Sequence, residues 1–262
     1  MKTINNVYYT DHADEYRALD LYLPDKAENC PAFVYFHGGG LEAGRRFNQD
    51  VTSQAQYLTE RGIAMISADY RLYPRVSFPE FIEDAAAAVA YVFKNAELYG
   101  IGQRIFVGGS SAGGYLSMML CFDEHYLGAH GLAVKDVAGF VHDAGQPTTH
   151  YNVLRERGID CRRLIVDEAA PLYHVGKATD YPPMLIIVSD NDMENRLEQT
   201  MLLRSTLRHF LGDKDQSELI VAHGNHTQYC GTYDAGGNNT FATMIEPFLA
   251  KHSDEKRHAE IE

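Results

Sequence analysis

The chain has 262 residues, of which 45% are hydrophobic and 23% are charged, which is typical of one soluble globular domain. Its formal net charge is −13, from 36 acidic and 23 basic residues, so its field repels phosphate backbones and anionic lipid surfaces. We therefore expect neither a nucleic acid nor a membrane as a partner; no prediction of oligomeric state follows.

The four cysteines are scattered along the chain without CxxC spacing. Their even number permits two disulfides, but a chain of this size does not need them. No apolar signal segment follows Met1, and no later apolar run approaches ~18 residues. These features predict a cytoplasmic protein with reduced thiols and without zinc.

Short apolar runs alternate with longer stretches of helical periodicity, which predicts an α/β fold with a mostly parallel sheet. Leucines alternate with polar residues over 19–23, which predicts an early, half-exposed strand. The next run, 32–36, is apolar throughout, as a strand covered on both faces would be. Five further strands of this kind are expected at 63–67, 104–107, 137–141, 184–188 and 219–221.

The intervening stretches carry apolar residues three and four positions apart, which predicts helices at 49–61, 80–99, 112–122, 195–210 and 240–252. No internal repeat or flexible linker interrupts the pattern, so we expect a single domain over residues 1–262. Segment 143–181 is long for a simple connection and is expected to form a small cap with a short helix at 152–157. The charged segment 253–262 is expected to be a flexible tail.

One pentapeptide predicts a catalytic nucleophile. Gly109-Ser110-Ser111-Ala112-Gly113 fits G-x-S-x-G between an apolar strand and a helix, which is the context that the motif requires. Such a turn forces its central residue into strained geometry, and the flanking glycines remove side chains that would clash. Ser111 is preferred to Ser110 because only Ser111 has glycines at both −2 and +2. A Gly/Ser-rich turn that matches by chance is the alternative, which the context disfavours.

A glycine run predicts an oxyanion hole. His37-Gly38-Gly39-Gly40 follows the apolar run 32–36. Consecutive glycines let backbone N–H groups approach a ligand closely, and the tetrahedral oxyanion of acyl transfer needs such donors. The predicted donors are the amides of Gly39, Gly40 and Ala112, and His37 is expected to organise the loop through its side chain. Phosphate-binding loops also use glycines, but the chain contains no G-x-x-x-x-G-K-[ST] motif and no G-x-G-x-x-G motif that opens a helix with an acid downstream.

A serine nucleophile in a G-x-S-x-G turn acts in a catalytic triad, in which an acid and then a histidine follow the serine in the chain. Asp190 and Asp192 come directly after the run 184–188, at the edge of the sheet where active sites of open α/β sheets lie. Asp192 is preferred because it lies further into the loop that must reach the histidine, and Asp190 would then be a turn or capping residue. Asp143, after the preceding strand, is a third candidate.

Two histidines, His223 and His226, follow the last predicted strand. His226 is the predicted base because the turn Gly224-Asn225 places it on a loop, whereas His223 is expected to be structural or part of the site wall. His226 would take the proton of Ser111 while Asp192 orients the ring, and water would then hydrolyse the acyl-enzyme.

Taken together, these motifs resemble the α/β-hydrolase superfamily, in particular its bacterial HGGG esterases, including acetyl and feruloyl esterases and the hormone-sensitive-lipase-like group. The resemblance covers roughly residues 19–248, including 69–72 and 78–84, whose counterparts are structural. It implies an eight-stranded sheet with helices on both faces, and a metal-independent enzyme without a cofactor. Two departures, the 36 residues before His37 and the serine at 110 in place of an acid, favour the compact esterases or the related arylformamidases.

The sequence therefore predicts a serine carboxylesterase for small-molecule esters with short-chain or small aromatic acyl groups, such as acetyl or feruloyl esters of carbohydrates. An arylformamidase-like amidase with the same triad is the alternative. A prolyl-oligopeptidase-type peptidase is less favoured because no propeller is evident, and a silent fold used for binding is disfavoured because every catalytic position is filled. Tyr173, Tyr229 and segment 145–151 either line the site or are ordinary cap residues.

Overall fold

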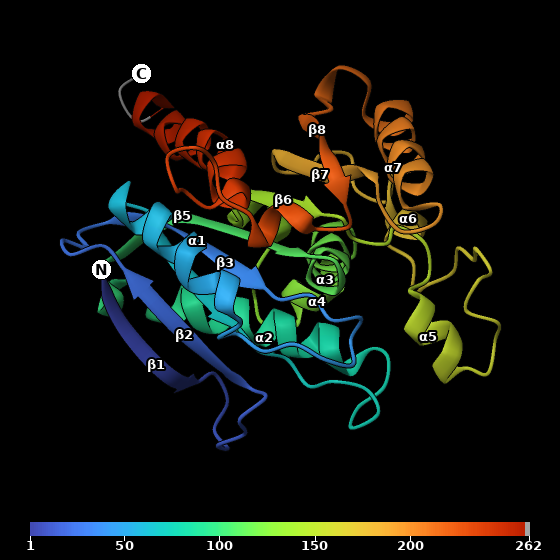
Figure 1. Cartoon of the computed structure of the whole chain (residues 1–262), viewed down its shortest axis with the longest axis horizontal. Helices are drawn as coiled ribbons and strands as arrows, with labels where there is room; N and C mark the ends of the chain where they lie inside the picture. The colour runs from blue at the N-terminus through green and yellow to red at the C-terminus, as the bar shows by residue number, and fades with distance from the viewer. Residues whose placement is uncertain (260–262) are drawn as a thin grey trace.

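The computed structural model describes residues 1–259 and contains an eight-stranded sheet in the order β1-β2-β4-β3-β5-β6-β7-β8 (Figure 1). From β4 to β8 neighbouring strands are parallel, whereas β2 is antiparallel to both β1 and β4. The strands are β1 Lys2–Tyr8, β2 Ala18–Leu23, β3 Cys30–Phe36, β4 Ala64–Ala68, β5 Ile101–Ser110, β6 Gly139–Asp143, β7 Met184–Asn191 and β8 Ser217–Asn225.

The predicted α/β-hydrolase fold class is confirmed, and all seven strands located from the sequence are present. The additional strand is the edge strand β1, whose mostly exposed, polar sequence carries little apolar signal. The prediction of a half-exposed β2 is wrong, because every residue of this strand is buried. The one acidic residue of the strand, Asp20, is buried, and hydrogen bonds satisfy its carboxylate. It accepts from the amide of Asn6 at 2.7 Å and from Nε of Arg46 at 3.0 Å.

Helices cover both faces of the sheet, as the apolar strands predict. The core on one face joins α2, α3 and α7 to strand residues such as Val34 and Val107. The core on the other face joins α1 and α8 to Phe33 and Phe106, their neighbours along the strands. The helices are α1 Gln49–Glu60, α2 Glu80–Asn95, α3 Ala112–Phe122, α4 Glu124–Gly128, α5 Tyr151–Glu156, α6 Pro171–His174, α7 Arg196–Leu211 and α8 Thr240–Ala259.

The segment predicted to form a cap, 143–181, contains the short helices α5 and α6 after β6. In Figure 1, α5 lies at the right-hand side, beyond the strands and far from both termini. It is tied to the glycine loop by a 2.7 Å hydrogen bond from Nδ2 of Asn152 to the carbonyl of Gly40. Helix α8 continues past the predicted end at His252 to Ala259, so the predicted tail begins as helix; residues 260–262 lie outside the described residues.

Within residues 1–259, no helix is both long enough and apolar enough to cross a membrane. The four cysteines all lie in this range and are free thiols. The same range contains no group of three or more His, Cys, Asp and Glu side chains arranged to hold a metal ion.

Candidate active site

The turn between β5 and α3 holds Ser111 in a conformation that few non-glycine residues adopt. Its backbone angles are φ 57° and ψ −111°, and its amide donates to the carbonyl of Asp143 at 2.8 Å. A Cβ atom on Gly113 would lie 1.9 Å from the carbonyl oxygen of Phe36, and one on Gly109 would lie 2.5 Å from the same oxygen. Both flanking positions therefore have to be glycine for the turn to pack against β3.

Three side chains from distant parts of the chain form a continuous series of contacts at this turn. Oγ of Ser111 lies 2.8 Å from Nε2 of His226, and Nδ1 of the same ring lies 2.5 Å from Oδ1 of Asp192. Asp192 follows β7 and His226 follows β8, and these parallel neighbours end at the same edge of the sheet. The arrangement can move a proton from the serine to the histidine.

The surroundings of Asp192 keep its carboxylate charged. Burial raises the pKa of this carboxyl, but the hydrogen bond from His226 and those from the amides of Met193, at 2.7 Å, and Ser189, at 3.2 Å, outweigh it and lower the pKa below its usual value. The side chain itself is fully buried. A fixed negative charge beside Nδ1 orients the imidazole and stabilises the imidazolium.

The alternative acids and base occupy other environments. Asp190 pairs with His223 at 2.7 Å on the surface, where their side chains are 44% and 97% exposed. This exposure contradicts a place for His223 in the site wall. Side chains alternate between the two faces of β8, and His223 lies on the face that is turned to solvent. Asp143 is buried behind the elbow, where Tyr229 donates to its carboxylate and the thiol of Cys230 lies at 3.6 Å.

The glycine loop presents free amides beside the serine. Gly39 and Gly40 have φ angles of 114° and 65°, a region that favours glycine. A Cβ atom on Gly38 would lie 3.2 Å from Cβ of Ser111, so the loop packs directly against the elbow. The backbone hydrogen bonds of the turns, loops and helix ends include none that is donated by the amides of Gly39, Gly40 or Ala112 to another described residue. These amides are therefore available to an oxygen of a ligand.

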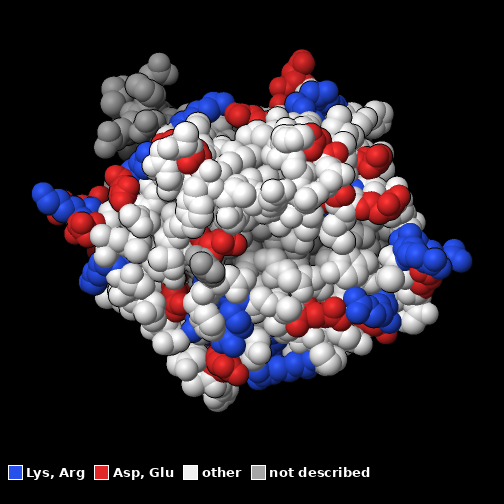
Figure 2. Space-filling model, in the orientation of Figure 1, with Lys and Arg blue, Asp and Glu red and all other residues white. Residues whose placement is uncertain are grey.

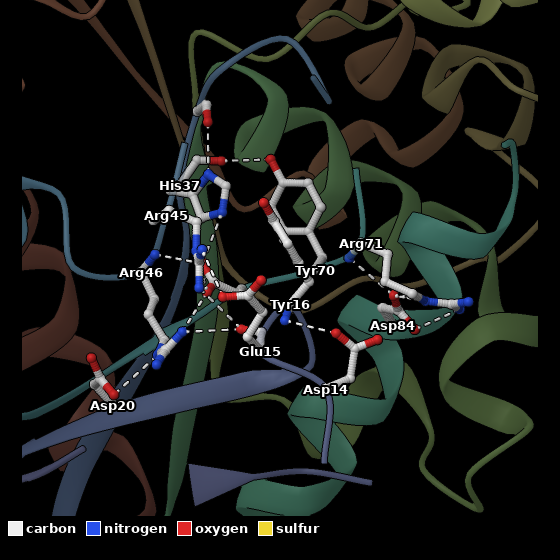
Figure 3. A network of polar contacts seen from close by, with 12 residues as sticks. Asp14, Glu15, Tyr16, Asp20, His37, Arg45, Arg46, Tyr70, Arg71 and Asp84 are labelled. Atoms are coloured by element: carbon white, nitrogen blue, oxygen red, sulfur yellow. Dashed lines mark hydrogen bonds and ion pairs between the residues drawn. The ribbon is translucent and has the colours of Figure 1, made fainter. Parts of the chain in front are cut away.

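The side chain of His37 supports this loop from below, as expected (Figure 3). Its Nδ1 donates to the carbonyl of Gly38 at 2.7 Å, and its Nε2 lies 3.3 Å from the carboxylate of Asp69. Tyr70 stacks on the imidazole at 4.6 Å and donates its hydroxyl to the carbonyl of His37 at 2.9 Å. These contacts constrain the glycine loop.

Asp69 also binds the segment that follows the glycine loop. It accepts from Nε of Arg45 at 2.9 Å and from the amide of Arg46 at 2.5 Å, and the Arg46 guanidinium reaches on to Asp20 (Figure 3). Burial raises the pKa of the Asp69 carboxyl, but its interactions with His37 and Arg46 lower the pKa by a larger amount, so that it lies below its usual value. The sequence alone does not show these contacts, because Asp20 and Asp69 are far from Arg45 and Arg46 in the chain.

A cavity of about 640 Å³ opens above the serine. Its walls come from the glycine loop, the elbow, the loop of His226, Tyr151 of α5, and one side of α1, which the sequence analysis had not placed there. Of the tyrosines considered, Tyr151 lines this cavity, Tyr173 is half exposed elsewhere, and Tyr229 is buried against Asp143. Figure 2 shows a hollow near the middle of this face, bordered mainly by uncharged residues, with acidic side chains at one edge.

The buried carboxyl of Asp143 predicts a pH dependence of stability. Burial raises its pKa from 3.8 to about 6, against hydrogen bonds from Ser110 and Tyr229. Between these values the native state holds a proton that the unfolded chain has released, so the free energy of unfolding falls as pH rises through this window. The loss by pH 7 is on the order of 2–3 kcal/mol.

The side chain in the variant Asp143→Asn does not titrate, so this variant should not show that fall in the free energy of unfolding. Urea unfolding of both proteins at pH 4.5 and pH 7 measures it as the difference between their pH dependences. Identical pH dependences in the two proteins would contradict a protonated carboxyl at position 143.

Comparison with known proteins places this site in a family. The profile of the Prolyl oligopeptidase family matches residues 80–255, and a profile described as BD-FAE matches residues 19–135. Carboxylesterase NlhH of Mycobacterium tuberculosis is 40% identical over 98 residues, which are 37% of this chain and 30% of that protein. Hormone-sensitive lipase of Homo sapiens is 35% identical over 125 residues, which are 46% of this chain and 11% of the lipase.

Among solved structures, a truncated carbohydrate esterase from gut microbiota superposes with a TM-score of 0.78 at 22% identity, covering 97% of this chain and 96% of that one. The sheet order and the elbow define an α/β-hydrolase, as predicted. The chain belongs to the prolyl oligopeptidase family, whose profile spans more than half of it. It matches less than a third of the length of the curated relatives described above.

Proposed function

We propose that the protein is a serine carboxylesterase that hydrolyses short-chain or small aromatic acyl esters, including acetyl or feruloyl esters of carbohydrates. The observation that carries the proposal is the unbroken series Ser111, His226 and Asp192, with contacts of 2.8 and 2.5 Å, beside amides that have no acceptor among the described residues. The names of the relatives, carboxylesterase and hormone-sensitive lipase, support ester hydrolysis as the reaction.

In the proposed mechanism, Oγ of Ser111 attacks the ester carbonyl carbon while Nε2 of His226 takes its proton. The amides of Gly39, Gly40 and Ala112 donate to the oxyanion that forms, and losing one such donor typically costs ~10²–10³ in rate. The imidazolium then protonates the leaving alcohol, which departs and leaves an acyl-enzyme. Water activated by the same histidine attacks the acyl carbon and releases the acid.

We expect the purified protein to hydrolyse p-nitrophenyl acetate and p-nitrophenyl butyrate, with a burst of p-nitrophenol where deacylation is slow. The measurement is the kcat/KM for both esters beside N-formylkynurenine and a prolyl p-nitroanilide. The last two substrates test the arylformamidase alternative and the peptidase activity suggested by the name of the matching family. Turnover of the amide substrates alone would replace the esterase proposal.

A further inference from the structure

Helix α1 contributes a polar wall to the active-site cavity. Asp50 and Gln54 both line this cavity, and they lie four residues apart in the helix, so they share one of its faces. Neither side chain belongs to the triad, the glycine loop or the cap. The mechanism proposed for ester hydrolysis leaves both without a role.

The amide of Gln54 is buried without a partner. The side chain is 1% exposed, and neither its Nε2 nor its Oε1 atom makes a hydrogen bond with any described residue. Buried polar side chains nearly always find partners, and an unsatisfied one costs stability. The exposed Gln56 on another face of α1 shows the contrast, because its Nε2 donates to Glu60 at 3.1 Å. An amide kept unpaired at the wall of a site is suited to a ligand.

The carboxylate of Asp50 stands one helical turn away from Gln54. Burial raises the pKa of this carboxyl, and no hydrogen bond from another described group lowers it. Both residues line the cavity, and the hydrogen-bonding capacity of their side chains is unused among the described residues. They share this cavity with Oγ of Ser111.

The chemistry of the pair defines what it can bind. A carboxylate accepts hydrogen bonds, whereas a carboxamide both donates and accepts them. Two neighbouring hydroxyl groups satisfy both side chains, since one can donate to Asp50 and the other can exchange hydrogen bonds with Gln54. A hydrocarbon chain would leave these groups unpaired, and an anionic group would be repelled by Asp50.

We infer that Asp50 and Gln54 form a subsite for a hydroxyl-bearing part of the substrate, next to the scissile ester. The inference rests on the proposed esterase function and assigns selectivity for hydroxylated esters to one face of α1. Binding of this part would orient the ester over Ser111, so the subsite should act on kcat/KM for hydroxylated substrates in particular.

Two acetate esters with the same acyl group and a six-membered ring in the alcohol test this subsite: a mono-O-acetylated methyl xyloside and cyclohexyl acetate. The measured quantity is the ratio of their kcat/KM values. We expect the wild-type protein to favour the xyloside and the variant Gln54→Leu to lower the ratio at least tenfold, because leucine has similar volume but cannot bind a hydroxyl group. Asp50→Asn should lower the ratio in the same direction.

The matched control is Gln56→Leu, the same substitution at the exposed position of the same helix, which should keep the wild-type ratio. Thermal melting shows that each variant is folded, and Asp50→Asn carries the test if Gln54→Leu does not fold. A wild-type ratio in Gln54→Leu and Asp50→Asn would overturn the subsite while leaving the esterase proposal in place. A wild-type protein that hydrolyses neither acetate nor p-nitrophenyl esters would overturn both.

Discussion

Replacing Ser111 with alanine should reduce ester hydrolysis by about 10⁴–10⁶-fold in kcat. Its Oγ lies 2.8 Å from Nε2 of His226 and beside the free amides of the glycine loop, so both the attack and the transfer of the proton depend on this atom. Initial rates with p-nitrophenyl acetate measure the loss. A fluorophosphonate probe, which reacts with activated serines, should label the wild-type protein but not this variant.

Ser110→Ala is the matched control for this result. The Ser110 hydroxyl is buried and lies 3.5 Å from Sγ of Cys230, on the side of the elbow that faces Asp143. We expect this variant to keep probe labelling and to keep activity within about tenfold of wild type, since removal of a structural hydroxyl costs about 1 kcal/mol. Labelling lost in Ser110→Ala and retained in Ser111→Ala would assign the nucleophile to the neighbouring serine.

Asp192→Asn should lower kcat by about 10⁴-fold while the protein remains folded. The carboxylate now accepts from Nδ1 of His226 at 2.5 Å and from two backbone amides. An asparagine amide facing Nδ1 would favour the wrong tautomer of the imidazole and would remove the charge that stabilises the imidazolium. The loss should appear mainly in kcat, with KM little changed, because the side chain of Asp192 is fully buried behind the histidine ring.

The same substitution two residues earlier, Asp190→Asn, provides the comparison. Asp190 and His223 form an exposed pair, whose attraction is screened by solvent and therefore contributes little. We therefore expect kcat within about twofold of wild type for this variant. Equal losses in Asp190→Asn and Asp192→Asn would show that the loop conformation, rather than the Asp192 carboxylate, sets the rate.

Some features of the proposed site can be predicted from the sequence, and others cannot. G-x-S-x-G and the glycine run are local patterns, since the steric demand of a tight turn is met by residues adjacent in the chain. The buried support of Asp69, His37 and Arg46 joins three segments, so no short motif shows it. The same holds for the face of α1 with Asp50 and Gln54, which in the sequence is an ordinary stretch of a mixed polar and apolar helix.

The sequence by itself determined the α/β-hydrolase class, seven of the eight strands, the glycine loop and the elbow with Ser111, because apolar periodicity and turn chemistry are local properties. After β7 and β8 it favoured Asp192 over Asp190, with Asp143 as a third candidate, and His226 over His223, but only from their positions in the loops. The tertiary structure decided where these side chains point: Asp192 and His226 turn inward to Ser111, and Asp190 and His223 lie in solvent. The physical reason is that side-chain direction after a strand depends on how the loops pack across neighbouring strands, and this packing depends on contacts between segments far apart in the chain.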